Sequence, residues 1–261
     1  MAERARVLLE VRGLSKSFGG AQVVRDCTFD VAEGEVVGLI GPNGAGKSTI
    51  VDLLTGFARP DAGVVRFAGG EIQGWPPHRI SRRGLVRTFQ LPKEWPDLTV
   101  MENMLIAAPD EGRETIWRPF VAARQLRRAE DADRERARAI LEEFDLLTAR
   151  NARAGALSGG QKRLLEFARI AMARPRMMVL DEPTGGVNPI LGDRIGDAIV
   201  GVAAGGGTVM IVEHDLAFIE RVCHSVIVMA SGTVIATGPF SALRSHRAVL
   251  DAYIGGAAAS A

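Results

Sequence analysis

Apolar residues along the chain fall into short runs that are separated by glycine-rich turns. Three early runs predict strands over Val7–Val11, Gln22–Asp30 and Val64–Phe67, because each is rich in strand-forming residues and is bounded by turn residues. Together they predict a small β layer in the first part of the chain.

Other apolar runs are joined to segments of helical periodicity. The run Glu35–Ile40 ends in a glycine-rich turn, and apolar residues then recur with helical spacing from Ile50. Met177–Leu180 and Thr208–Val212 are buried-type strands with helical patterns between them, as a parallel sheet requires. The alternation of strands and helices predicts an α/β fold.

The middle of the chain carries helical patterns without strands. Thr99 and Glu102 have the spacing of a capping box, which predicts the start of a helix that runs through Leu105. A second helix is predicted from apolar residues on one face, namely Ala137, Ile140, Leu141, Phe144 and Leu147. Charges of both signs balance in this region, so we interpret it as a solvated helical lobe rather than a surface for RNA or lipid.

Composition limits the possible classes of function. Lysine and arginine number 32 against 31 acids, so the net charge of +1 gives no field that would attract nucleic acid. The two cysteines, Cys27 and Cys223, lack a metal-type spacing and are interpreted as packing residues. The longest apolar run, Ala198–Val212, is interrupted by glycines and is shorter than the roughly 18 to 20 residues that span a bilayer. If the protein serves transport, another chain must cross the membrane.

A phosphate-binding loop follows the strand Glu35–Ile40. The segment fits the P-loop pattern and lies between a strand and a helix, which is the context that confirms such a motif. Its glycines let backbone N–H groups surround phosphates, Lys47 reaches the β and γ phosphates of ATP, and Ser48 can bind Mg²⁺. The nucleotide-binding residues predicted here are Gly41, Pro42, Asn43, Gly44, Ala45, Gly46, Lys47, Ser48 and Thr49.

Two further motifs carry chemistry. The strand Met177–Leu180 ends in Asp181 and Glu182, which predicts a metal-binding carboxylate followed by a carboxylate that polarises the attacking water. The segment Leu157-Ser158-Gly159-Gly160-Gln161 precedes a helix, where Ser158 can act as the cap and the glycines expose N–H groups to an anion. The chain therefore contains two separate candidate phosphate sites.

The P-loop, the LSGGQ segment and the Asp-Glu-Pro strand, spaced as they are, resemble ABC-type ATPases over nearly the whole chain. The resemblance implies a RecA-like P-loop NTPase core with an antiparallel β layer and an inserted α-helical signature subdomain. It also implies that two cassettes dimerise head to tail, with each ATP and its Mg²⁺ lying between the P-loop of one cassette and the Ser158–Gln161 segment of the other.

Further residues follow from the same resemblance. Phe18 matches the aromatic residue that stacks on adenine, the alternative being a buried core residue. Gln90 matches the glutamine that contacts Mg²⁺ and the attacking water, and His214 matches the histidine that contacts the γ phosphate. Asn188 stands where many relatives have an aspartate. The implied catalytic residues are thus Lys47, Gln90, Glu182 and His214, and the implied metal ligands are Ser48, Gln90 and Asp181.

Several segments resemble one group within this family, the ATPase subunits of importers for branched-chain amino acids, urea and amides. They are Trp75–Ile80, Gly84–Gln90, Gly186–Pro189, the charged lobe before Asp145 and the segment Leu250–Ile254. The resemblance implies a second cassette and two transmembrane permease subunits as partners, an external solute-binding protein acting indirectly, and no nucleic acid. It implies a peripheral location on the cytoplasmic face of the inner membrane.

Three alternatives stay open at this point. A soluble ABC ATPase, such as one in iron–sulfur cluster assembly, also has a single cassette. The cassette of a lipopolysaccharide exporter is the nearest rival among transporters, although the Pro77-His78-Arg79 segment argues against it. A nucleotide sensor without hydrolysis is disfavoured because Glu182 and His214 are both present.

We expect a single domain over residues 6–255. Residues 6–90 and 162–240 are assigned to the core with its β layer, 91–161 to the helical subdomain and 241–255 to a C-terminal helix. The small residues 256–261 are expected to form a disordered tail.

Overall fold

The structure is a computed structural model that describes residues 6–88, 94–109, 123–244 and 246–258. The chain divides into two compact units. One unit contains the described residues up to Arg87 and from Arg176 onward, and the other spans Thr88–Pro175. The boundaries expected from sequence at 90 and 161 stay a proposal, although helix α5 (Gly159–Met172) passes through residue 161 without a break.

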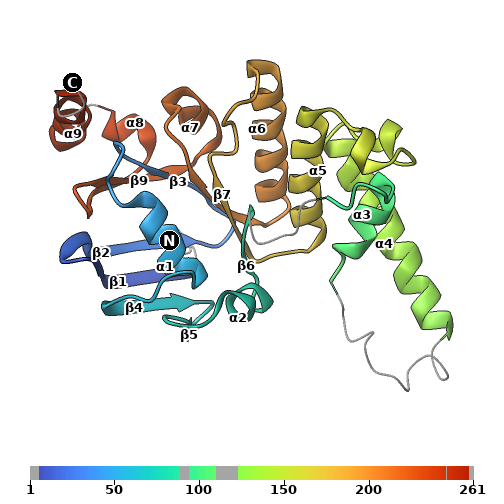
Figure 1. Ribbon diagram of the computed structural model, residues 1–261, viewed down its shortest axis with the longest axis horizontal. Coiled ribbons are helices and arrows are strands. Elements are labelled where there is room, and N and C mark those ends of the chain that lie inside the picture. The colour runs from blue at the N-terminus through green and yellow to red at the C-terminus, as the bar shows by residue number, and fades with distance from the viewer. Residues whose placement is uncertain (1–5, 89–93, 110–122, 245, 259–261) are drawn as a thin grey trace, which may run out of the picture. The chain divides into compact units, whose positions relative to one another are not determined.

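The first unit is built on two sheets (Figure 1). The four-stranded sheet has the order β2-β1-β4-β5, and its strands pair antiparallel. Its strands are β1 (Val7–Phe18), β2 (Ala21–Ala32), β4 (Ala62–Phe67) and β5 (Gly70–Glu71). The three strands predicted for the β layer are confirmed, and each extends beyond its predicted range.

The six-stranded sheet has the order β10-β9-β3-β8-β7-β6. Its strands are parallel except for β10, which pairs antiparallel with β9. The strands are β3 (Val36–Ile40), β6 (Leu85–Arg87), β7 (Met177–Asp181), β8 (Thr208–Val212), β9 (Ser225–Ala230) and β10 (Thr233–Gly238). The three predicted buried strands, now β3, β7 and β8, are confirmed, whereas the apolar pattern did not single out β6, β9 or β10.

Helices of the first unit cover both faces of the six-stranded sheet. Figure 1 shows α6 and α7 on one side of this sheet, and α1 with the four-stranded sheet on the other. The helices are α1 (Lys47–Thr55), α2 (Pro77–Arg82), α6 (Pro189–Ala204), α7 (Leu216–Val222), α8 (Phe240–Leu243) and α9 (Arg247–Ala258). A single core joins the two sheets to α1, with Phe67, Leu54, Val179 and Met229 among its buried members.

The second unit contains α3 (Val100–Ile106), α4 (Ala123–Glu143) and α5, with 3-10 turns at Leu147–Ala149 and Ala154–Ala156. The predicted capping box is confirmed, since the Thr99 hydroxyl accepts from the Glu102 N–H and the Glu102 carboxylate accepts from the Thr99 N–H. The predicted apolar face of the second helix is wrong at its end. Helix α4 stops at Glu143, and Asp145 adopts a left-handed φ of 53°, so Leu146 and not Leu147 is buried.

Asn103 holds the segment that precedes α3. Its amide is fully buried, accepts from the Trp95 N–H at 2.9 Å and donates to the carbonyls of Trp95 and Thr99 at 3.0 Å. The buried guanidinium of Arg169 on α5 lies 4.6 Å from the centre of the Trp95 ring. These contacts stabilise the segment against α5 within the helical unit.

The C-terminal region differs from its expected form. It contains two helices, α8 and α9, where one helix over 241–255 was expected. Helix α9 continues to Ala258, three residues into the segment that was expected to be disordered, because Ala257 and Ala258 favour helix. Among the described residues, no helix combines the length and apolarity that crossing a membrane requires.

Candidate functional site

The glycine-rich loop between β3 and α1 has the backbone of an anion site. Gly41 and Gly46 adopt φ values of 150° and 96°, and a Cβ atom would lie 2.1 Å from the Met229 carbonyl oxygen at the first and 2.8 Å from that of Val23 at the second. Gly46 caps α1 and no side chain accepts from the first turn of this helix. The N–H groups of that turn are therefore left for a bound anion, where the helix dipole favours negative charge.

The Lys47 ammonium group lies within this loop. Its Nζ donates to the carbonyl oxygens of Gly41 at 2.7 Å and Pro42 at 3.0 Å. Burial lowers the pKa of Lys47, and the charges of Glu182 and Asp181 act in the opposite direction. The Lys47 ammonium and the carboxylates of Asp181, at the end of β7, and Glu182, just after it, thus share one electrostatic environment.

Asp181 is held by an arginine that the sequence analysis did not single out. Arg87, the last residue of β6, donates to the Asp181 carboxylate from Nη2 and to the Asp52 carboxylate of α1 from Nη1, both at 2.6 Å. The Asp181 side chain is 16% exposed and the Arg87 side chain 13%. One guanidinium therefore joins the helix after the P-loop to the end of β7.

Glu182 is exposed and has a backbone conformation that is unusual for its residue type. Its φ is 46°, in the left-handed region where a side chain costs about 1 to 2 kcal/mol. The backbone is fixed on both sides, since the Glu182 N–H donates to the Val212 carbonyl at 2.9 Å and the Gly185 N–H donates to the Glu182 carbonyl at 3.0 Å. Such strain is kept where the surrounding structure demands it, and it is concentrated at functional sites.

A buried acid links the segment after Glu182 to the end of β8. Glu213 is 1% exposed, and its carboxylate accepts from the Thr184 N–H at 2.9 Å, from the Thr184 hydroxyl and from the His214 N–H at 3.0 Å. The His214 Nδ1 lies 3.5 Å from the same carboxylate, and the imidazole is 69% exposed. Glu213 therefore orients both segments while the His214 ring faces solvent.

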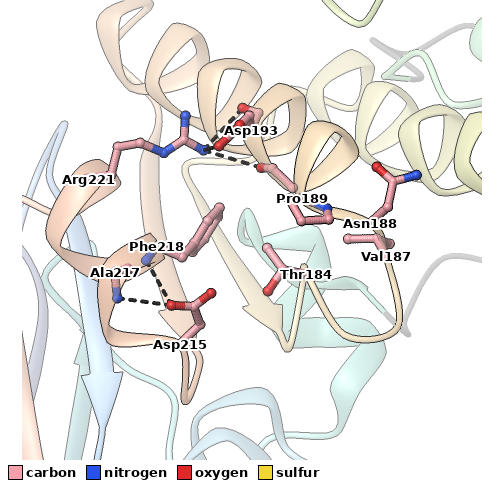
Figure 2. A pocket seen from close by; sticks show the side chains of 10 residues that line it. Thr184, Val187, Asn188, Pro189, Asp193, Asp215, Ala217, Phe218 and Arg221 are labelled. Atoms are coloured by element: carbon pink, nitrogen blue, oxygen red, sulfur yellow. Dashed lines mark hydrogen bonds and ion pairs between the residues drawn. The ribbon is translucent and has the colours of Figure 1, made fainter.

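Val187 and Asn188 of the segment Gly186-Val187-Asn188 line a pocket of about 310 Å³. Asn188 caps α6, where its side-chain oxygen accepts from the Leu191 N–H at 2.9 Å. Figure 2 shows Asp215 and Phe218 across the pocket and Arg221 paired with Asp193. Asparagine and aspartate cap helices equally well. Compared with an aspartate, Asn188 therefore keeps the cap of α6 and lacks the negative charge.

Phe18 is 50% exposed, and the Lys16 ammonium lies 5.3 Å from the centre of its ring. The alternative of a buried core phenylalanine is therefore wrong. An exposed aromatic face beside a cation suits stacking on a base of an anionic nucleotide.

The signature segment starts α5 in the helical unit. The Ser158 hydroxyl accepts from the Gln161 N–H at 3.3 Å, and the Gln161 side chain accepts from the Ser158 N–H at 3.0 Å. The predicted cap is confirmed and is a complete capping box. A side chain at Gly159 would meet no atom within 4 Å, so the backbone there is open. Ser158, Gly159, Gly160 and Gln161 are thus presented at a helix start.

The predicted site residues are divided between the two units of the chain. Lys47, Asp181 and Glu182 are brought together in the first unit, and Phe18 and His214 belong to the same unit. The signature segment lies in the second unit, and Gln90 lies outside the described residues. Sequence reasoning missed Arg87 and Glu213. The usable signal was a charged residue that follows a run of apolar residues, as Arg87 follows Leu85-Val86 and Glu213 follows Val209–Val212.

The donor types present fit a magnesium ion that is bound with a nucleotide. Ser48 and Asp181 offer oxygen ligands, which Mg²⁺ prefers. Within the described residues, no group of three or more His, Cys, Asp or Glu side chains is arranged to hold a metal. This set agrees with the usual pattern for Mg²⁺, in which one or two protein oxygens act together with substrate phosphates.

Comparisons with known proteins identify the family of the chain. A family profile described as "ABC transporter" matches residues 24–185. The high-affinity branched-chain amino acid transport ATP-binding protein BraF of Pseudomonas aeruginosa is 39% identical, with 96% of this chain and 99% of the relative covered. The corresponding protein LivG of Escherichia coli K12 is 34% identical, with 95% and 98% covered.

A solved structure, the ADP conformation of MJ1267, an ATP-binding cassette of an ABC transporter, matches with a TM-score of 0.79 at 32% identity over 96% of this chain and all of that one. The predicted P-loop NTPase fold is confirmed by this likeness. Because the family profile covers more than half of the chain and the relatives match almost end to end, the chain belongs to the ABC transporter family, as one of its nucleotide-binding, ATP-hydrolysing cassettes.

Proposed function

We propose that this chain is the ATP-hydrolysing subunit of an importer for branched-chain amino acids or a related small solute. The observation that carries the proposal is the near full-length similarity to ATP-binding proteins of branched-chain amino acid transport, at 34% to 39% identity. The chain would act with two membrane permease subunits, at the cytoplasmic face of the inner membrane, and with an external solute-binding protein that it does not contact.

ATP would bind with its phosphates against the N–H groups of the loop Gly41–Gly46 and its adenine on Phe18. Lys47 would neutralise charge on the β and γ phosphates, which is supported by its position in the loop. Mg²⁺, when bound through Ser48, Asp181 and Gln90, supplies further positive charge for the phosphates. These groups act mainly by position and charge, because phosphoryl transfer needs little covalent help from the protein.

Hydrolysis would depend on two side chains that lie beyond the strand ends. Glu182 would orient and polarise the attacking water, and its strained backbone supports a fixed carboxylate. His214 would contact the γ phosphate, with Glu213 holding its backbone N–H. The opposing face of the nucleotide would be covered by Ser158–Gln161 of a second cassette, so two chains would complete each site.

The transport proposal is tested by purification from membranes. The chain is expressed with the permease genes of its own genome, extracted in detergent and captured by a tag on the cassette. We expect two permease subunits to copurify and the partner binding protein to retain a branched-chain amino acid. Capture of an active ATPase without any permease would overturn the transport assignment and favour a soluble ATPase.

The roles of Glu182 and of the second cassette are tested together with Glu182→Gln. This change removes the base while keeping the size of the side chain, so we expect normal ATP binding, at least about 100-fold slower phosphate release, and a stable dimer in the presence of ATP. Phosphate release and size-exclusion chromatography measure both effects. Wild-type turnover in the variant would remove Glu182 from its assigned role.

A further inference from the structure

Arg87 is placed between two carboxylates that come from different elements. Its guanidinium donates to Asp52 on α1 and to Asp181 at the end of β7, at 2.6 Å in each case. The side chain of Asp52 is 39% exposed, while those of Arg87 and Asp181 are far more buried. Both contacts are charge-assisted hydrogen bonds from one planar group, so they fix direction as well as distance.

Arg87 lies at the end of a strand that is adjacent to the strand carrying Asp181. Arg87 is the last residue of β6, where it pairs in register with Val179 of β7, two residues before Asp181. The chain passes into the helical unit immediately afterwards. Asp52 lies on the same helix as Lys47 and Ser48, the P-loop residues that are proposed to contact the phosphates and the metal. One side chain thus joins the end of β6, the P-loop helix α1 and Asp181 of β7.

We propose that Arg87 is a positioning residue for the metal site. It fixes the Asp181 carboxylate relative to α1 by occupying Oδ2, and it leaves Oδ1 to serve the metal ion. The inference rests on the proposed role of Asp181 in Mg²⁺ binding. Replacement of a residue that hydrogen-bonds to a metal ligand typically lowers metal affinity about 10- to 100-fold.

A competing effect predicts the opposite result, which makes the proposal testable. Arg87 also carries a positive charge close to the site, and loss of that charge by itself would strengthen the binding of a divalent cation. Arg87→Lys keeps the charge and loses the planar fork, whereas Arg87→Met loses both. If positioning dominates, both variants bind the metal more weakly. If charge repulsion dominates, only Arg87→Met changes, and it binds more tightly.

The experiment titrates Mn²⁺, as a spectroscopic substitute for Mg²⁺, into the full chain with a non-hydrolysable ATP analogue. The protein is in excess so that nearly all nucleotide is bound, and free Mn²⁺ is followed by electron paramagnetic resonance. We expect both Arg87 variants to bind Mn²⁺ about tenfold more weakly. Binding of the analogue without metal should stay within about twofold of wild type, because the Arg87 contacts with Asp52 and Asp181 lie outside the loop Gly41–Gly46. Arg66→Lys, which alters the exposed pair with Glu71, is the matched control and should leave Mn²⁺ binding unchanged.

Each other outcome has a definite meaning. Tighter Mn²⁺ binding in Arg87→Met, or unchanged binding in both variants, overturns the positioning role. Loss of metal-free analogue binding together with a lowered melting temperature in both variants shows a purely structural role and also overturns it. Asp181→Asn separates this inference from the proposed function, because unchanged Mn²⁺ affinity in that variant would refute the metal role of Asp181 itself.

Discussion

The left-handed backbone of Glu182 predicts a reversal of the usual stability order of alanine and glycine. At an ordinary helical position, glycine is less stable than alanine by about 0.8 to 1 kcal/mol. At a φ of 46°, a residue with a Cβ atom costs about 1 to 2 kcal/mol, which glycine avoids. Glycine in turn loses about 0.4 to 1 kcal/mol through the greater freedom of the unfolded chain.

The difference leaves Glu182→Gly about 0.8 kcal/mol more stable than Glu182→Ala, within a range of about 0 to 1.6 kcal/mol. Urea unfolding of the full-length variants measures this difference as a change in the midpoint at constant slope. Glu130 gives the matched control, since it is an exposed glutamate inside helix α4. There we expect the ordinary order, with Glu130→Gly less stable than Glu130→Ala.

The same variants connect stability to function. Both Glu182 replacements should lose hydrolysis, because both remove the carboxylate, although the glycine variant is the more stable of the two. If Glu182→Gly is less stable than Glu182→Ala by the amount seen at position 130, the backbone at 182 is not strained. A strained backbone would then not be what fixes the Glu182 carboxylate.

Three further predictions concern other parts of the molecule. Phe18→Ala should weaken ATP binding about 5- to 150-fold by equilibrium binding, through loss of stacking, while Phe57→Ala, at a similarly exposed ring, leaves it unchanged. Asn103→Ala removes three hydrogen bonds of 3.0 Å or less from a buried amide, so it should lower the free energy of unfolding in urea by about 3 kcal/mol. Asn151→Ala, at an exposed asparagine, is the control and should lower it by less than about 0.5 kcal/mol. Equal losses in the two variants would refute the role of Asn103. Burial raises the pKa of Cys223 from 9.0 to about 12. As pH rises, the thiol therefore ionises in the unfolded chain before it ionises in the folded chain. The free energy of unfolding should be unaffected below pH 9 and should fall by up to about 1.4 kcal/mol per pH unit between pH 9 and 12. Unfolding of Cys223→Ala across the same pH range should lack this decline.

Short-range patterns were sufficient for much of the fold and for the motifs. The glycines from Gly41 to Gly46 and the capping boxes at Thr99 and Ser158 act between residues a few positions apart, so their meaning is contained in the local sequence. The strands β3, β7 and β8 were predicted because strands buried on both faces are apolar throughout. Strand β6 escaped because three residues form a strand only through pairing with β7.

The tertiary structure alone decided how the acids of the site are held. Arg87 meets Asp181 across 94 positions and Asp52 across 35, and Glu213 meets Thr184 across 29. No periodicity or spacing encodes such contacts, since they form only when strand ends and a helix that are distant in sequence pack side by side. The sequence by itself determined the family motifs and predicted which residues bind and hydrolyse ATP. The folded chain determined which side chains hold those residues, because such contacts depend on distance in space and not along the chain.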